Sequence, residues 1–429
     1  MNLKRTVCAL VPQSLLEFRR NLLDSYYISA SVRRHKKALI KLRNKKSTIR
    51  VVFFVFLDAT WKCDELYRLL ERDPRFDPII LICPIVNFGK ANMLKEMNRT
   101  YNVLSKRYKS IYKAYDLREN KFMKVKSELK PDLIFYTNPY EGLMSDSVYI
   151  KKFKDVLTAY VPYFFSLHSD YKLGYDQLLH NLVWRFYLET DESKSLACRY
   201  SRAKGRNTKV VGYPGVEDLM KNKSKSCYEW KIVESSHKRI IWAPHHTIEH
   251  NNQIELSTFL VYFNYMFEVA KKYEDKIQIC FKPHPVLFSK LCLLWGEEET
   301  IKYYDRWRNL PNGMLHEDDY HDLFVSSDAI IHDCGSFITE YLYIGNPGLY
   351  LDNGKDYSLN FNSIAIRSLE YYYHASCREQ IDDFILNVIK GNDPVKAKRE
   401  EYVKSFLMPP NNQSACKNIY CDLLDELFN

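Results

Sequence analysis

Short apolar runs alternate with longer amphipathic stretches through most of the chain. The runs are continuous and often β-branched, which is typical of strands buried on both faces of a parallel sheet. The stretches between them place apolar residues at helical spacing. The predicted strands are Val51–Leu57, Ile79–Cys83, Leu133–Tyr136, Tyr160–Leu167, Arg239–Trp242, Ile277–Phe281, Ala329–Ile331 and Gly348–Leu351. The predicted helices are Asp64–Arg72, Thr258–Tyr273, Asp319–Ser327, Phe337–Ile344 and Arg378–Lys390.

This alternation predicts an α/β fold with parallel sheets. It breaks near the middle, where the turn residues of 212–215 (GYPG) and the polar stretch 221–226 (KNKSKS) separate two halves of similar length. We therefore predict two Rossmann-like domains facing a cleft, with a basic helical N-terminal leader. The predicted segments are a leader over 1–48, an N-terminal domain over 49–220, a C-terminal domain over 221–395 and a helical segment over 396–429.

The net charge of +10 belongs almost entirely to the leader. The first 50 residues hold 13 Lys and Arg against Glu17 and Asp24, whereas the rest holds 50 basic and 51 acidic residues. A body that binds nucleic acid carries its own basic face, so we expect no nucleic-acid partner. The 11 cysteines show no CxxC spacing, which favours reduced thiols over a zinc or disulfide framework.

The leader reads as one or two basic helices over 13–46. Such a segment either lies on an anionic membrane surface or packs on the body as a solvated helix, and the pattern fits both. No apolar run approaches the roughly 20 residues that span a bilayer. The candidate membrane-facing cations are Arg19, Arg20, Arg33, Arg34, Lys36 and Lys37.

Polar residues follow four of the predicted strands directly. Ligands of open parallel sheets bind beyond the carboxyl ends of the strands, so these residues predict one shared site. They are His168, then His245 and His246, then Lys282 and His284, and finally Asp333, Gly335 and Ser336.

The residue types at these ends favour anion recognition and proton transfer. Lys282 and His284, stiffened by prolines, are suited to contact phosphate oxygens. Ser336 is predicted to cap a helix whose free N–H groups attract an anion, and Glu340 lies one turn further, within reach of ribose hydroxyls. His168 and His246 are the candidate general bases.

Several other chemistries lack their motifs. The sequence has no GxxxxGK[ST], GxGxxG or GxSxG motif, which excludes a P-loop, a standard dinucleotide fingerprint and a nucleophile elbow. His245, His246 and His250 raise the idea of a metal site, but no HExxH motif or nearby pair of carboxylates supports it. We predict neither a metal nor a cofactor.

Four segments between residues 160 and 355 resemble a known family. The segment 167–174 (LHSDYKLG) resembles Trp-His-Gly-x-x-x-Lys, and 211–218 (VGYPGVED) resembles Gly-x-Pro-x-x-Asp. The pair 242–246 (WAPHH) and 282–285 (KPHP) resembles Tyr-Ala-Pro-Thr and Lys-x-His-Pro, and 327–336 (SDAIIHDCGS) resembles Ser-Asp-x-x-Ile-Thr-Asp-Tyr-Ser-Ser. The chain is thus similar to the CDP-glycerol glycerophosphotransferases, the teichoic-acid polymerase and primase type of glycosyltransferase-B-fold enzymes.

The resemblance implies an activity and roles for the site residues. An acceptor hydroxyl, on a saccharide or lipid-linked acceptor, attacks the β-phosphorus of a CDP-alditol and releases CMP. His168 matches the acceptor-side general base, with Lys172 in the same segment, and His284 matches the donor-phosphate histidine. Ser336 is placed on the diphosphate and Glu340 near the ribose. The family works at the inner face of the bacterial membrane, so we expect a cytoplasmic, peripheral location.

The chain departs from the family pattern at Ser169, His245, His332 and Cys334. Three of these departures surround the predicted donor site, so other donors stay open. A glycosyltransferase that uses a CMP- or UDP-activated sugar is the first alternative. A nucleotide-sugar epimerase is a second, although the paired carboxylates it needs are not identified. A pseudo-transferase that serves as a membrane-bound scaffold is the third.

Overall fold

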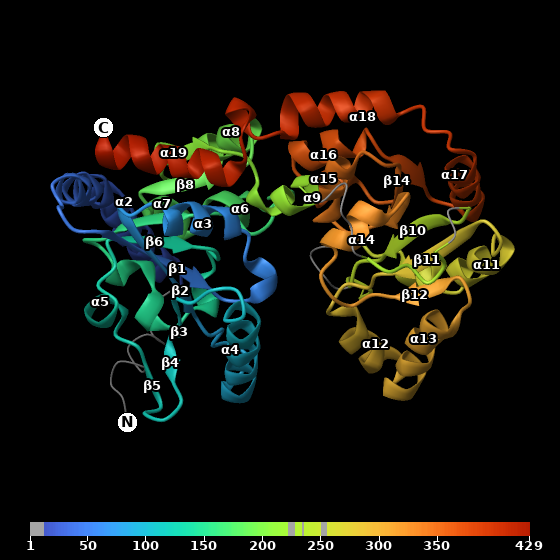
Figure 1. Ribbon diagram of the computed structural model, residues 1–429, viewed down its shortest axis with the longest axis horizontal. Coiled ribbons are helices and arrows are strands. Elements are labelled where there is room, and N and C mark those ends of the chain that lie inside the picture. Colours follow the sequence, from blue (N-terminus) through green and yellow to red (C-terminus); the bar gives the residue numbers. More distant parts are fainter. Residues whose placement is uncertain (1–12, 222–227, 234–235, 250–254) are drawn as a thin grey trace. The chain divides into compact units, whose positions relative to one another are not determined.

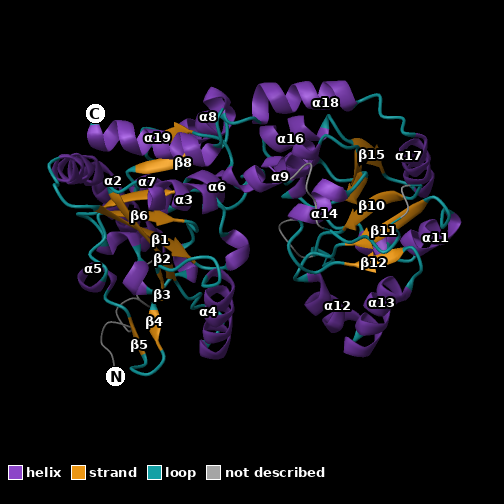
Figure 2. Cartoon of the chain, viewed as in Figure 1, coloured by secondary structure: helices purple, strands orange, loops and turns teal. Residues whose placement is uncertain are grey.

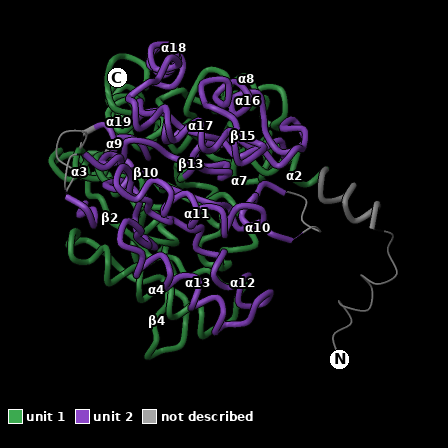
Figure 3. Tube along the Cα trace, turned by 90° about the vertical axis from the view of Figure 1, so that its right-hand side faces the viewer, with its two compact units in different colours: residues 1–163, 171–214, 409–429 green, residues 164–170, 215–408 purple. Residues whose placement is uncertain are grey.

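The computed structural model describes residues 13–221, 228–233, 236–249 and 255–429. The chain forms two compact units (Figure 3). Unit 1 consists of Met1–Tyr163, Tyr171–Pro214 and Pro409–Asn429, and unit 2 consists of Phe164–Asp170 and Gly215–Met408.

Unit 1 is built on a seven-stranded sheet in which every neighbouring pair is parallel. Its strand order is β3-β2-β1-β6-β7-β8-β9. The strands are β1 (Ile49–Val55), β2 (Phe76–Ile82), β3 (Ile111–Lys113), β6 (Leu133–Tyr136), β7 (Leu157–Tyr160), β8 (Arg185–Leu188) and β9 (Thr208–Val210). A small antiparallel pair, β4 (Tyr115–Asp116) and β5 (Lys121–Phe122), lies outside this sheet (Figure 1).

Helices cover both faces of the unit 1 sheet, because its central strands are apolar on both sides. Phe53 of β1 stacks on Phe135 of β6, with ring centroids 4.9 Å apart. The helices are α2 (Gln13–Arg43), α3 (Asp64–Arg72), α4 (Lys90–Leu104), α5 (Val125–Glu128), α6 (Tyr171–Tyr175), α7 (Leu178–Leu182), α8 (Asp191–Tyr200) and α19 (Ala415–Phe428).

Unit 2 repeats the plan with six parallel strands in the order β12-β11-β10-β13-β14-β15. Figure 2 draws the strands in orange and the helices in purple. They are β10 (Lys238–Ala243), β11 (Ile277–Phe281), β12 (Gly313–Leu315), β13 (Ala329–His332), β14 (Gly348–Leu351) and β15 (Tyr373–Ala375). The helices are α9 (Glu217–Lys221), α10 (Phe259–Tyr262), α11 (Tyr265–Lys272), α12 (Leu287–Trp295), α13 (Glu297–Asn309), α14 (His321–Ser326), α15 (Phe337–Glu340), α16 (Ser363–Leu369), α17 (Arg378–Lys390) and α18 (Lys396–Tyr402). Trp242 of β10 is fully buried and stacks on Phe281 of β11.

Both sheets have the doubly wound order in which the first strand lies beside the fourth. In unit 2 these strands are β10 and β13, which pair from Ile240 with Ala329 to Ala243 with His332. Successive strands are added on one side of β10 up to β12 and on its other side from β13 onward. Such a reversal leaves a crevice at the carboxyl ends of the two central strands, where ligands of this fold class bind. The predicted α/β fold with two Rossmann-like units and an N-terminal helix is confirmed.

Three predicted elements differ clearly from the structure. The predicted helix over Phe337–Ile344 is α-helical only in α15, and Tyr341–Ile344 forms a 3-10 helix. The predicted strand over Tyr160–Leu167 is wrong: β7 ends at Tyr160, because Pro162 lacks the N–H that a central strand requires. The following segment, Phe164–Asp170, belongs to unit 2. The predicted helix over Thr258–Tyr273 is divided into α10 and α11.

The C-terminal segment divides differently from the predicted boundary at 396. Residues up to Met408 belong to unit 2, whereas Pro409 onward returns to unit 1. Helix α19 buries Ile419, Leu423 and other apolar side chains in the same core cluster as β1 and α3. Gly212 has a φ of +98°, and a Cβ there would lie 2.5 Å from the Pro409 Cβ, so this return needs glycine.

Candidate functional site

Three neighbouring strands of unit 2, β11, β10 and β13, bring three of the predicted strand-end segments together. A cavity of about 670 Å³ lies at these ends. Its apolar lining includes Phe164, Leu256 and Phe361. Its polar lining consists of His168, His245, His246, Thr247, His284, Lys290, Ser336 and Asn360, together with the backbone of Gly335. The described lining therefore contains imidazoles and an ammonium group but no carboxylate, which suits an anionic ligand.

His168 reaches this cavity by a route that differs from the predicted one. The segment 164–170 pairs with 359–362, since the Asn362 N–H donates to the Leu167 carbonyl over 2.8 Å and the Ser169 N–H to the Asn360 carbonyl over 2.9 Å. Both ring nitrogens of His168 are buried, and neither has a hydrogen-bond partner among the described residues. Burial lowers the pKa of this imidazole, against the opposing effects of the Asp170 charge and of the nearby Asp170 backbone. A neutral, unpartnered imidazole in a cavity wall is able to accept a proton from a ligand.

Asp333 lies behind the cavity wall and does not line the cavity itself. It is fully buried at the end of β13, accepts a hydrogen bond from the His245 N–H, and accepts two more from the N–H and hydroxyl of Thr258. Burial raises the pKa of the Asp333 carboxyl to about 6, and these donors oppose that shift. The carboxylate thus holds the start and end of the segment 245–258 against β13, and it is a positioning residue.

The three histidines that follow β10 and β11 form one cluster. The ring centroids of His246 lie 4.3 Å from those of His245 and 4.2 Å from those of His284. Each residue offers one nitrogen, and these nitrogens lie within 4.8 Å of one another. Burial lowers the pKa of His245 to about 2 and of His284 to about 3, and lowers that of His246 as well, so the cluster is uncharged at neutral pH. The sequence spacing did not indicate His284 as the third member of the cluster, because His284 follows a different strand from His245 and His246. His250, the third histidine that the spacing suggested, lies outside the described residues.

Other predicted site residues do not line the described part of the cavity. Lys282 is buried, and this burial lowers its pKa. Glu340 is buried as well and accepts a hydrogen bond from the Tyr320 hydroxyl. Lys172 is exposed on α6 of unit 1.

Ser336 stands at the predicted N-cap position of α15, but it makes no side-chain cap. Its backbone is already helical there, and its hydroxyl contacts the Cys334 sulfur at 3.4 Å instead. Helix α15 contains only Phe337–Glu340, so the expected helix-dipole contribution to anion binding is small.

Sequence reasoning missed Lys290, Thr247 and Asn360 in the cavity wall. Lys290 lies on α12 and pairs with Glu249 at 2.9 Å. No local motif marks these residues, because Lys290 reaches the cavity from a helix, Thr247 and Asn360 reach it from loops, and the three are far apart in sequence.

The predicted leader forms α2, and its described part packs on unit 1. Ile28, Ala38 and Leu42 are buried there, and the Arg206 guanidinium donates to the Ile28 carbonyl. The opposite side exposes apolar residues, with Leu22 57% and Tyr26 65% exposed. Among the predicted cations, Arg33, Lys36 and Lys37 are exposed, Arg34 is half-buried, and the side chains of Arg19 and Arg20 lie outside the described part.

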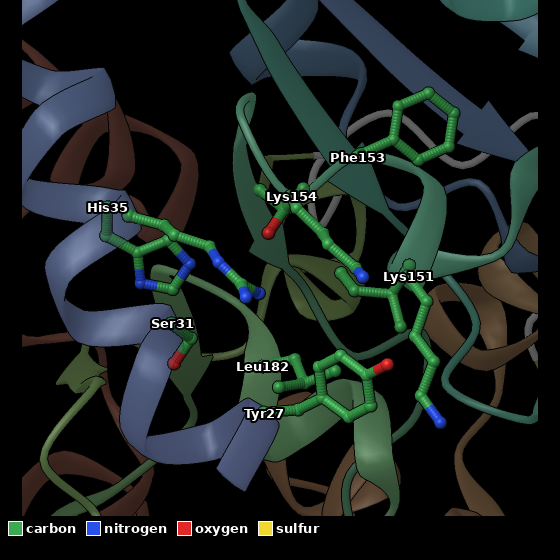
Figure 4. A pocket seen from close by; sticks show the side chains of 10 residues that line it. Tyr27, Ser31, His35, Lys151, Phe153, Lys154 and Leu182 are labelled. Atoms are coloured by element: carbon green, nitrogen blue, oxygen red, sulfur yellow. The ribbon is translucent and has the colours of Figure 1, made fainter.

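A small basic cavity of about 20 Å³ lies beside α2 in unit 1 (Figure 4). Lys151 and Lys154 place their ammonium groups 5.0 Å and 4.7 Å from the ring centroid of Tyr27. Burial lowers the pKa of His35, which also lines this cavity, to about 4. None of the helices in the described residues is long and apolar enough to cross a bilayer.

Comparisons by sequence gave no match: no family model matches the chain, and neither does any curated protein. Solved structures with the same fold do match. A UDP-GlcNAc 2-epimerase from Neisseria meningitidis bound to UDP-GlcNAc has a TM-score of 0.58 at 15% identity, covering 88% of this chain and 100% of that one. A putative UDP-N-acetylglucosamine 2-epimerase from Listeria monocytogenes has a TM-score of 0.57 at 14% identity, covering 88% and 96%.

A variant of the wall teichoic acid polymerase TagF, soaked with CDPG, has a TM-score of 0.56 at 13% identity. That match covers 97% of this chain and 100% of the polymerase chain. The expected structural resemblance to a teichoic-acid polymerase is therefore confirmed over nearly the whole chain. At such identities the likeness concerns the fold: this protein shares the two-unit α/β fold of these nucleotide-sugar epimerases and of the teichoic acid polymerase.

Proposed function

We propose that this protein is a transferase that uses a nucleotide-activated donor. It moves an alditol-phosphate, glycerol-phosphate or ribitol-phosphate, from a CDP-linked donor to a hydroxyl of a surface-polysaccharide or lipid-linked acceptor, and it releases CMP. The observation that carries this proposal is the set of neutral, partly unpartnered imidazoles around a cavity at the junction of β10 and β13. A neutral imidazole can donate a hydrogen bond to a phosphate oxygen from one nitrogen, and it can accept a hydroxyl proton at the other.

The reaction assigns a role to each group. The acceptor oxygen forms a bond to the β-phosphorus while the bond from that phosphorus to the bridging oxygen breaks, so CMP leaves with the electron pair. His168 takes the acceptor proton, because its ring nitrogens have no other partner in the described structure. His245, His284 and Lys290 contact the phosphate oxygens on which charge accumulates.

The fold comparisons support this proposal in general terms. The matched structures include a polymerase soaked with CDPG and epimerases bound to UDP-GlcNAc, so this fold accommodates both kinds of ligand in those proteins. The second candidate, a glycosyltransferase that uses a CMP- or UDP-activated sugar, is favoured by the departures from the family pattern at Cys334, which lines the cavity, and at the buried His332 two positions before it. In that case the attack occurs at the anomeric carbon.

We also propose that α2 holds the enzyme on the cytoplasmic face of an anionic membrane. Exposed apolar and cationic side chains share the described part of this helix, as in helices that lie in a bilayer interface. Attachment at the membrane would keep the enzyme at the surface that carries a lipid-linked acceptor.

A panel of donors tests the function without an acceptor. The melting temperature is measured with CDP-glycerol, CDP-ribitol, CMP-sialic acid, CMP-Kdo and two UDP-sugars. A ligand at 100 times its Kd adds about 2.7 kcal/mol to the stability of the folded chain. His284→Ala is expected to remove the shift, whereas His374→Ala, at an exposed histidine of β15, is expected to retain it. A shift with CMP- or UDP-sugars and none with CDP-alditols overturns phosphotransfer in favour of glycosyl transfer.

A further inference from the structure

The hydrogen bonds around Thr247 determine which nitrogen of His245 carries its proton. The Thr247 oxygen accepts from the Leu256 N–H over 3.0 Å and from the Ser257 N–H over 3.2 Å, which occupies both lone pairs. Its third neighbour is His245 Nδ1, at 3.0 Å. The threonine hydroxyl must therefore donate to Nδ1, and the neutral imidazole of His245 carries its hydrogen on Nε2.

His284 has the same tautomer for a different reason. The backbone N–H of Val286 donates to His284 Nδ1 over 3.2 Å. An N–H donor beside Nδ1 requires a lone pair on that atom, so the hydrogen of the neutral ring is again on Nε2. Both rings line the cavity, and both therefore offer it a hydrogen-bond donor.

This arrangement is the reverse of what a metal ion requires, although the nitrogens of the cluster lie within 4.8 Å of one another. A metal-bound histidine uses the lone pair of one nitrogen and donates its other N–H to an acceptor. If Nε2 of His284 held a metal, its Nδ1–H would face the N–H of Val286. At His245, the Nδ1–H would face a hydroxyl oxygen that already accepts two hydrogen bonds.

We propose that His245 and His284 form a pair of neutral Nε2–H donors for a phosphate-type oxyanion, with Thr247 as the positioning residue that sets the tautomer of His245. This inference deepens the proposed function and rests on it for the nucleotide part of the ligand. Lys290 supplies positive charge at the same cavity, partly offset by its ion pair with Glu249. The neutral donors add directed hydrogen bonds without the repulsion that three adjacent imidazolium groups would cause.

Nitrogen-15 NMR of the full chain labelled at histidine tests the tautomers, since Nδ1 and Nε2 give different shifts when protonated. His245→Gln and His284→Gln assign the two signals, and both wild-type rings are expected to carry the proton on Nε2. Thr247→Val is expected to move His245 toward the Nδ1–H tautomer, whereas Thr247→Ser, which keeps the hydroxyl, is expected to retain Nε2–H. The signal of His284 serves as the internal control for an intact fold.

Binding of inorganic pyrophosphate provides the second measurement. Loss of one directed hydrogen bond in Thr247→Val is expected to weaken binding about 3- to 10-fold, and Thr247→Ser is expected to bind like the wild type. An Nδ1–H signal for either wild-type ring overturns the inference. Binding of one zinc ion from ZnCl₂ that His284→Gln abolishes also overturns it, in favour of a metal site. Pyrophosphate binding with the expected tautomers, but no turnover of any CDP-alditol, refutes the proposed function and leaves this inference standing.

Discussion

His180 is predicted to make unit 1 sensitive to mild acid. Its ring is buried in α7, lies parallel to Phe186 of β8 with centroids 4.6 Å apart, and accepts a hydrogen bond from the Gln177 N–H at Nδ1. Burial lowers its pKa to about 3, against the opposing effect of the Tyr175 carbonyl. Below pH 6.5 the unfolded chain therefore binds a proton at this residue that the folded chain does not, and stability falls as the pH falls.

The size of the effect follows from the two pKa values. With a folded pKa of about 3 and an unfolded value of about 6.5, His180 lowers the free energy of unfolding by about 2 kcal/mol between pH 7.5 and pH 5. His180→Phe removes this contribution, whatever it does to stability at pH 7.5. His180→Gln, which retains an acceptor for the Gln177 N–H, provides a second variant.

Urea denaturation at the two pH values measures the loss, and hydrogen exchange of the β7 and β8 amides assigns it to unit 1. The wild type is expected to lose about 2 kcal/mol more than either variant. His374→Phe, at an exposed histidine of β15, serves as the control and is expected to behave like the wild type. If His180→Phe and His180→Gln lose as much stability between pH 7.5 and pH 5 as the wild type, burial of this imidazole does not have the effect described.

Three further predictions concern catalysis, membrane binding and packing. His168→Asn is expected to lower kcat for the donor identified by the panel by about 10²-fold or more, because the proton acceptor is lost. Reversal of charge at Lys36 and Lys37 is expected to weaken binding to anionic vesicles at least about 30-fold, from roughly 1 kcal/mol per cation. Asp422→Ala is expected to destabilise unit 1 by roughly 2 kcal/mol, because Arg185, 3.0 Å away, and the Tyr187 hydroxyl lose a shared buried acceptor, while Arg185 keeps its ion pair with Glu426.

Each of these has a matched control. For catalysis, His374→Asn is expected to retain turnover. If His168→Asn turns over as fast as the wild type, His168 is not the general base. For the membrane, Lys396→Glu with Lys398→Glu makes the same charge change on exposed positions of α18, and equal loss of vesicle binding in both pairs would refute a specific role for α2. For packing, Asp425→Ala removes an exposed carboxylate of the same helix, and a similar melting temperature for both variants would contradict the Asp422 account.

Much of the fold can be predicted from local sequence pattern. The strands Leu133–Tyr136, Ile277–Phe281 and Gly348–Leu351 and the helices Asp64–Arg72 and Arg378–Lys390 have the bounds that their patterns predict. These elements are predictable because a strand buried on both faces must be apolar throughout, and an amphipathic helix must repeat its apolar positions along one side.

The strand-end rule predicts that His245, His284 and Gly335 gather at one edge of the sheet, since parallel strands carry their loops to the same edge. In the structure the three residues line one cavity. The proposed roles of these residues remain predictions.

Three features of the cavity depend on the folded chain: His168 and Lys290 line it, and Thr247 lies beside His245. Pro162 ends β7, and the segment after it pairs with residues 359–362, nearly 200 positions away in sequence. Thr247 can set the tautomer of His245 only once the N–H groups of residues 256 and 257 donate to its hydroxyl oxygen. Local pattern records whether a residue is buried, but a contact between distant loops depends on strand order and loop closure, which no short stretch of sequence encodes.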